Sequence, residues 1–120
     1  MIFKKMISSF RFAIHGILDV CRHGNNMKIH LVAAVMSILL SIYLQLSTLE
    51  WCCILGCIFV VLAAEMLNSA IEYTVDLITP DYHELAKKAK DAGAGAVLLV
   101  SILAVIIACI IFLPKMLHLI

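Results

Sequence analysis

The chain is short, apolar and nearly neutral. Of its 120 residues, 64% are hydrophobic and 14% are charged, and the formal net charge is +1 at pH 7; soluble domains contain about 45–50% and about 25% of these classes. A chain of this length cannot bury so much apolar surface in its own core, and its mean hydropathy is +1.10. The composition excludes a soluble globular domain and predicts a single integral membrane domain over residues 1–120.

The first segment, residues 1–28, repeats apolar side chains every three to four positions, with Lys, Arg, Ser and His between them. This spacing is typical of an amphipathic surface helix that lies in the membrane interface with its basic face toward anionic headgroups. His-Gly-Asn-Asn at residues 23–26 is its expected break. The segment has no continuous apolar run and no small-residue cleavage site, so we do not expect a signal peptide.

Three apolar runs come after it, each long enough to cross a bilayer as a helix. Ser47 or Thr48 is expected to cap the second helix, with Glu50 in its first turn. The short connection before it predicts an antiparallel hairpin. The second run spans about 45 Å at about 1.5 Å per residue, which exceeds a hydrocarbon core of about 30 Å, so its last turns should emerge into water. The predicted transmembrane helices are residues 29–46, 49–78 and 91–113.

A polar stretch at residues 79–91 separates the second and third runs. Pro80 is expected to end the second helix, Asp81 to cap the segment after it, and Pro114 to end the third helix. Lys and Arg gather in this stretch and before the first run, so the positive-inside rule places both segments on the cytoplasmic side of the membrane. The scattered cysteines and histidines lack metal-site or disulfide spacing and are interpreted as packing or interfacial residues.

The end of the second apolar run carries Glu65, Asn68, Glu72 and Asp76. Offsets of 3, 7 and 11 residues share one side of a helix that turns about 100° per residue. Carboxylates are costly beside hydrocarbon and usually functional there. One of the two glutamates could take a proton while the other stays ionised and binds a divalent metal. The alternative is that these residues pair between helices and hold an oligomer together.

The polar stretch lies at the same end of the fold as these carboxylates. Its lysines could hold phosphate groups that a metal ion bridges to the carboxylates; by itself the stretch would be interpreted as a solvated loop. Together the two features predict phosphoryl transfer without a P-loop or a kinase glycine-rich loop. Three spans cannot easily shield the polar residues, so we expect oligomerisation, helped by the small residues Ala92 and Ala96.

A family resemblance rests on E-M-L-N-S-A-I-E-Y-T-V-D followed by D-Y-H-E-L-A-K-K-A-K-D-A-G-A-G-A-V-L. The chain resembles the prokaryotic diacylglycerol kinase family, which includes undecaprenol kinases, over essentially its whole length. The resemblance implies an all-α membrane fold of one surface helix and three transmembrane helices per subunit. It also implies an ATP- and Mg²⁺-dependent lipid kinase that forms a homotrimer with active sites shared between neighbouring subunits.

The resemblance also implies roles for individual residues. Glu65 matches the catalytic base, Glu72 a metal-binding carboxylate that helps to hold Mg-ATP, and Asn68 and Asp76 supporting residues. The other residues that match nucleotide contacts are Lys5, Phe12, Asp81, Tyr82, His83, Lys90 and Asp91. Besides Glu65, the residues that match the lipid-binding surface are Ser9, Phe10, Ala13 and Ile14.

One position departs from the family pattern. The family carries a metal-binding glutamate in a pattern like N-E-x-N-x-x-I-H, and here that position holds Gly24, although Asn26 and His30 align. Asp19 lies off that helix face, and Asn25 is a neutral and weaker ligand. The acceptor lipid could be diacylglycerol or undecaprenol. The alternative function is an impaired family member that serves as a membrane scaffold or binds lipid; a transporter is disfavoured because its carboxylates would lie near mid-bilayer.

Overall fold

The computed structural model describes all residues of the chain except Asn25. The described residues form four helices and no strand, which confirms the all-helical prediction. The break predicted at residues 23–26 falls where α1 ends, at His23, and α2 begins, at Met27; Asn25 lies outside the described residues. The helices are α1 (Ile2–His23), α2 (Met27–Tyr43), α3 (Thr48–Ile78) and α4 (Glu84–Leu119).

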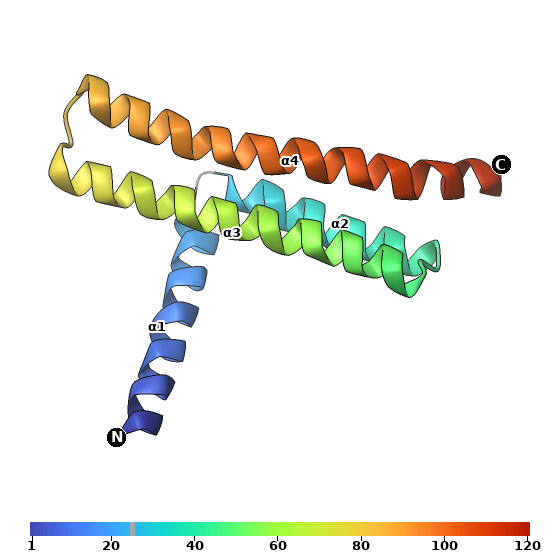
Figure 1. Cartoon of the computed structure of the whole chain (residues 1–120), viewed down its shortest axis with the longest axis horizontal. Helices are drawn as coiled ribbons and strands as arrows, with labels where there is room; N and C mark the ends of the chain where they lie inside the picture. The colour runs from blue at the N-terminus through green and yellow to red at the C-terminus, as the bar shows by residue number, and fades with distance from the viewer. Residues whose placement is uncertain (25) are drawn as a thin grey trace.

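Helices α2, α3 and α4 form a bundle in which α3 packs against both α2 and α4 (Figure 1). Helices α3 and α4 are antiparallel and lie side by side along most of their length. Helix α1 leaves this bundle steeply, with its axis 100° from that of α2, and its N-terminus points away from the other helices. The molecule is therefore flat, measuring 54 × 44 × 20 Å.

The connection between α2 and α3 contains the predicted cap. The Ser47 hydroxyl accepts a hydrogen bond from the Glu50 N–H at 3.3 Å, and the Glu50 carboxylate accepts one from the Ser47 N–H at 2.9 Å. Lys115 Nζ lies 3.1 Å from the same carboxylate and ties the end of α4 to the start of α3. A buried apolar cluster lies at this end, formed by Leu46, Ile54, Ile111 and Phe112.

The ends of the helices differ from the predicted spans. Helix α2 ends at Tyr43 rather than at residue 46. Helix α4 begins at Glu84 rather than near residue 91, since Ala-Lys-Lys-Ala-Lys forms helix readily. Its N-cap is His83 and not Asp81, because the His83 ring nitrogen Nδ1 accepts a hydrogen bond from the Leu85 N–H at 3.1 Å. Helix α4 also continues through Pro114, which removes only one backbone donor near its end.

The surfaces of α2, α3 and α4 expose many large apolar side chains, as expected for helices that face lipid. Helices α3 and α4 are each long and apolar enough to cross a membrane. The bent pair of α1 and α2 meets the same test when it is taken together as one further span. The structure therefore supports two or three membrane-spanning segments.

Candidate functional site

Glu65 lies inside the bundle, on α3. Its side chain is 2% exposed, and its Oε2 atom lies 3.6 Å from Nε2 of His30 on α2, whose side chain is 16% exposed. This separation is just beyond hydrogen-bond distance. A buried carboxylate is costly unless it is paired or hydrogen-bonded. The first turn of α2 therefore supplies a polar neighbour for a carboxylate that α3 carries into the core.

Asn68 lies one turn further along α3 and is 5% exposed. Its Nδ2 donates to Oε1 of Glu72 at 3.5 Å, which links the two polar residues along one face as predicted. Helix α4 approaches Asn68 at Gly93, where a Cβ atom would lie only 2.5 Å from Asn68 Oδ1. The close approach within the chain therefore occurs at Gly93, while Ala92 and Ala96 are exposed.

A cavity of about 300 Å³ opens at this point between α2, α3 and α4. It is lined by every buried side-chain atom without a hydrogen-bond partner among the described residues: His30 Nε2, Glu65 Oε2, Asn68 Oδ1 and Ser101 Oγ. Each buried polar group without a partner costs about 1–3 kcal/mol. Four such atoms from three helices around one space indicate a site that binds a polar group of a ligand. We call it the polar cavity.

A second cavity, of about 370 Å³, lies beside the connection between α3 and α4. Lys90 Nζ lies 2.5 Å from Asp76 Oδ1, and Lys87 Nζ lies 2.6 Å from Asp91 Oδ2, so each lysine is held by a carboxylate. The structure thus brings together five of the residues predicted to contact nucleotide. Those that line this cavity are Asp81, Tyr82, His83, Lys90 and Asp91.

The predicted site residues on α1 are not brought to either cavity within one chain. All are exposed, and the N-terminal part of α1 points away from the bundle (Figure 1). The last turns of α1 do reach α3, where the Tyr73 hydroxyl donates to Asp19 Oδ2 at 2.8 Å. The predicted residues on α1 are Lys5, Ser9, Phe10, Phe12, Ala13 and Ile14.

Gly24 is the C-cap of α1, and its N–H donates to the Val20 carbonyl at 2.7 Å. A Cβ atom on Gly24 would lie 2.5 Å from that same backbone oxygen. The close contact therefore accounts for glycine at this position, although its φ of −67° suits any residue. A glutamate could stand here only if the end of α1 shifted.

Few metal-binding side chains gather in the described part of the chain, which holds no group of three or more His, Cys, Asp or Glu residues placed to bind an ion. Besides Glu65, which lines the polar cavity, the nearby oxygen donors are the amide oxygen of Asn68 and the carboxylate of Glu72, which accepts a hydrogen bond from Asn68. Mg²⁺ often takes only one or two protein carboxylates and completes its shell with phosphate and water. These donors fit a magnesium ion that arrives with a nucleotide.

His30 and Ser101 were not predicted as site residues. The sequence alone indicates an interfacial role for His30, and Ser101 is a single hydroxyl in a long apolar run. The only sequence signal for His30 is its alignment with the family pattern at the start of the first apolar run. Their place beside Glu65 in the lining of the polar cavity depends on the packing of helices that are distant in the sequence.

Comparison with known proteins gives a consistent result. Residues 11–112 match the family model described as prokaryotic diacylglycerol kinase. The undecaprenol kinase of Bacillus subtilis (strain 168) is 42% identical over 112 residues, which cover 93% of this chain and 91% of that protein. The diacylglycerol kinase of Synechocystis sp. is 38% identical over 115 residues, which cover 95% of this chain and 66% of that protein. The diacylglycerol kinase of Escherichia coli (strain K12) is 39% identical over 80 residues, which cover 67% of this chain and 66% of that protein.

Proposed function

This chain belongs to the prokaryotic diacylglycerol kinase family, and from that premise we propose that it transfers the γ-phosphoryl group of ATP to the hydroxyl of a membrane lipid. It is a lipid kinase of a bacterial membrane. The observation that carries the proposal is the polar cavity, where a buried carboxylate and three further polar atoms lack partners. A lipid hydroxyl is small, polar and uncharged, so it can satisfy several of these atoms at once.

In the proposed reaction, Glu65 accepts the proton of the lipid hydroxyl. The lipid oxygen then bonds to the γ-phosphorus, and the bond from that phosphorus to the β-phosphate oxygen breaks to release ADP. His30 Nε2, 3.6 Å from the carboxylate, can accept a hydrogen bond from the protonated Glu65 after a small movement. Asn68 lies between the two carboxylates along α3 and donates a hydrogen bond to Glu72.

The nucleotide is proposed to bind in the cavity beside the connection between α3 and α4. Lys87 and Lys90 supply positive charge there, and the carboxylates that hold them fix their position. Such fixed charges stabilise phosphate charge in phosphoryl transfer. Mg²⁺, held by Glu72 and the amide oxygen of Asn68, would supply further neutralisation of the phosphates. This end of the bundle faces the cytoplasm, where ATP is available.

The assembly is proposed to be a homotrimer in which α1 lies in the membrane interface. Lys5 and Phe12 would then contact the nucleotide of a neighbouring subunit, since α1 leaves its own bundle. Ser9, Phe10, Ala13 and Ile14 would border the acceptor lipid. Diacylglycerol and undecaprenol are both candidate acceptors, as the names of the relatives indicate for those proteins.

A second candidate function is a catalytically impaired member that binds lipid or serves as a scaffold. The observation that favours it is Gly24, which stands where the family pattern has a metal-binding glutamate and where an added Cβ would lie 2.5 Å from the Val20 backbone oxygen. One carboxylate, Glu72, is then left to bind the magnesium ion. This candidate predicts lipid binding without phosphorylation.

One assay tests both candidates. The purified full chain in mixed micelles is given labelled ATP and Mg²⁺ with either diacylglycerol or undecaprenol. We expect label in at least one lipid, and its loss when EDTA removes the metal. Label in neither lipid would contradict the kinase proposal and support the impaired candidate. Label that persists in EDTA would contradict the role given to Mg²⁺ and Glu72.

A further inference from the structure

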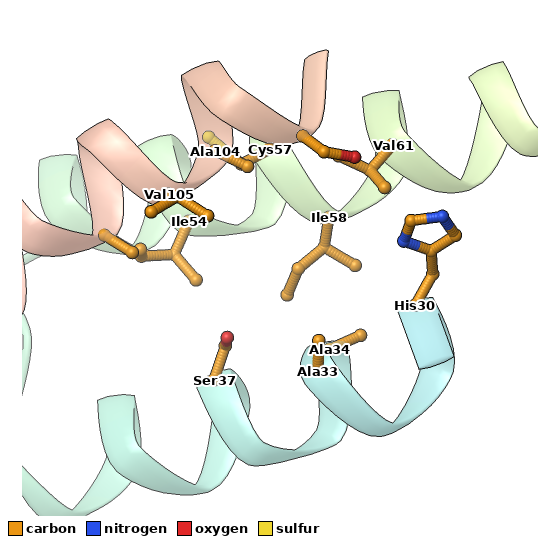
Figure 2. Close-up of a pocket in the computed structure, with 12 residues that line it drawn as sticks. His30, Ala33, Ala34, Ser37, Ile54, Cys57, Ile58, Val61, Ala104 and Val105 are labelled. Carbon is orange, nitrogen blue, oxygen red and sulfur yellow. The ribbon is translucent and has the colours of Figure 1, made fainter. Parts of the chain in front are cut away.

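An apolar cavity of about 190 Å³ lies between α2, α3 and α4, further into the bundle than the polar cavity. In Figure 2, Ile54 and Ile58 of α3 point across it toward Ala34 and Ser37 of α2. Helix α4 contributes small or branched side chains to the same wall. We call it the apolar cavity; its lining residues include Ala33, Cys57, Val61, Ala104, Val105 and Ala108.

The two cavities meet at His30 and Ser101, which line both of them. Figure 2 shows the His30 ring at one end of the apolar cavity, beside Val61. The two cavities are therefore adjacent and differ in polarity: one contains the partnerless atoms of Glu65 and Asn68, and the other is lined mainly by aliphatic side chains. An alcohol that carries a hydrocarbon chain has the same division of polarity.

The volume of the apolar cavity limits which molecules can bind in it. An apolar space of about 150 Å³ stays free of water and binds a molecule the size of benzene, so this cavity holds a segment of several carbons. An α-helix with its side chains is about 10–12 Å across and does not fit such a space. The remainder of a longer chain would extend between α2 and α4 into the bilayer.

From this arrangement we propose that the apolar cavity binds one hydrocarbon chain of the acceptor lipid and thereby holds the lipid hydroxyl against Glu65. The inference rests on the proposed function and adds to it a chain-binding subsite inside the bundle, separate from the surface of α1. Small side chains on α2 and α4 keep the cavity open, so substitution by a larger apolar residue closes it. Acceptors with long chains depend on the cavity, and acceptors with very short chains do not.

The kinetic test uses two filling variants and a matched control. Ala104→Leu and Cys57→Leu place extra carbons in the apolar cavity, whereas Cys52→Leu makes the same change at an exposed position of α3. We expect KM for the long-chain acceptor to rise about tenfold or more in the filling variants, since a pocket discriminates about 10–200-fold per methylene. KM for ATP stays unchanged, because the proposed nucleotide cavity lies beside the connection between α3 and α4. Comparing undecaprenol with dioctanoylglycerol shows whether the bound chain is isoprenoid or acyl.

A binding test separates this proposal from the proposed function. A lipid alcohol with a diazirine on its chain is crosslinked by light to the full chain in nanodiscs, and the labelled peptides are identified by mass spectrometry. We expect label at residues 33–37 and 101–108, lost in both filling variants and retained in Cys52→Leu. Such label without any phosphorylation would refute the kinase function but support the chain site. Equal label in all variants, or an altered oligomeric state with unchanged KM, would overturn the chain site.

Discussion

The burial of the Glu65 carboxylate costs free energy, and this cost suggests that the residue is kept for function. The side chain is almost fully buried, yet its Oε2 atom has no hydrogen-bond partner in the described part of the chain. An apolar residue at the same position would avoid the cost of burying a carboxylate. Asn68 and His30 each have one further atom in the same condition around the same cavity. Residues that only held helices together would be expected to satisfy one another.

We expect Glu65→Gln to lower kcat by about 10²–10⁴-fold, the usual contribution of a general base. The amide keeps the shape of the side chain but cannot accept the proton of the acceptor hydroxyl. KM for ATP should change little, because the proposed nucleotide cavity lies beside the connection between α3 and α4. Glu84→Gln, an exposed carboxylate in the first turn of α4, is the control. Near-normal kcat in Glu65→Gln would remove Glu65 from the mechanism.

At the scale of elements, the contact between α3 and α4 depends on Gly93. Its missing side chain leaves room for Asn68 Oδ1, and Ile71 Cδ1 would lie 3.3 Å from an added Cβ. Helix α4 carries another glycine two residues later, Gly95, where an added Cβ would meet no atom within 4 Å. The two glycines therefore give a matched pair that separates helix propensity from packing.

We expect Gly93→Ala to destabilise the fold by about 1–3 kcal/mol, the usual cost of overpacking, and to lower activity by displacing Asn68. Gly95→Ala should be neutral or stabilising by up to about 1 kcal/mol, since alanine is the better helix former. Thermal unfolding in detergent and the lipid kinase assay measure the two effects. Equal stability of the two variants would show that α4 can move away from Asn68 without cost.

The end of α1 gives a second prediction at this scale. Because a Cβ at Gly24 would meet the Val20 backbone oxygen, Gly24→Glu should lower stability by about 1–3 kcal/mol and should not simply add a metal-binding carboxylate. Gly16→Ala is the control, since an added Cβ there meets no atom within 4 Å. Unfolding curves and the Mg²⁺ dependence of activity are the measurements. Tighter Mg²⁺ activation without loss of stability would contradict the steric argument.

Elements were easier to predict from the sequence than their contacts. Apolar run length predicted the helices, and Ser47 or Thr48 was the predicted cap of α3; the structure shows that it is Ser47, with Glu50 completing the capping box. The third helix was predicted to begin near residue 91, but α4 begins at Glu84. The sequence between these positions is charged, which suggested a connection, yet Lys and Ala both favour helix. The close approach at Gly93 and the partnership of His30 with Glu65 depend on how the helices are rotated against each other. Periodicity within one helix carries no information about that rotation.

The whole molecule divides its functional parts between a bundle and a projecting helix. At one end, the bundle holds the polar cavity and the second cavity beside the connection between α3 and α4. At the other end, it holds the Ser47 cap and the buried apolar cluster. Helix α1 carries Lys5 and Phe12 away from the bundle at a steep angle (Figure 1). If these residues serve the reaction, a single chain cannot place them beside its own Glu65 in this conformation. This arrangement is the physical reason to expect an active site made by two subunits.

Subunit mixing tests that expectation. Glu65→Gln and Lys5→Ala each remove a different part of a shared site, so each variant alone should be weak. In the proposed homotrimer, a mixed assembly would hold some sites that combine the intact α1 of one subunit with the intact Glu65 of its neighbour. We therefore expect activity to rise well above either variant when the two are unfolded together and reconstituted as one sample. Variants that are reconstituted into separate vesicles, which are then combined, are the control, because subunits embedded in different vesicles cannot mix. No gain on joint reconstitution would indicate that α1 folds back and completes the site within its own chain.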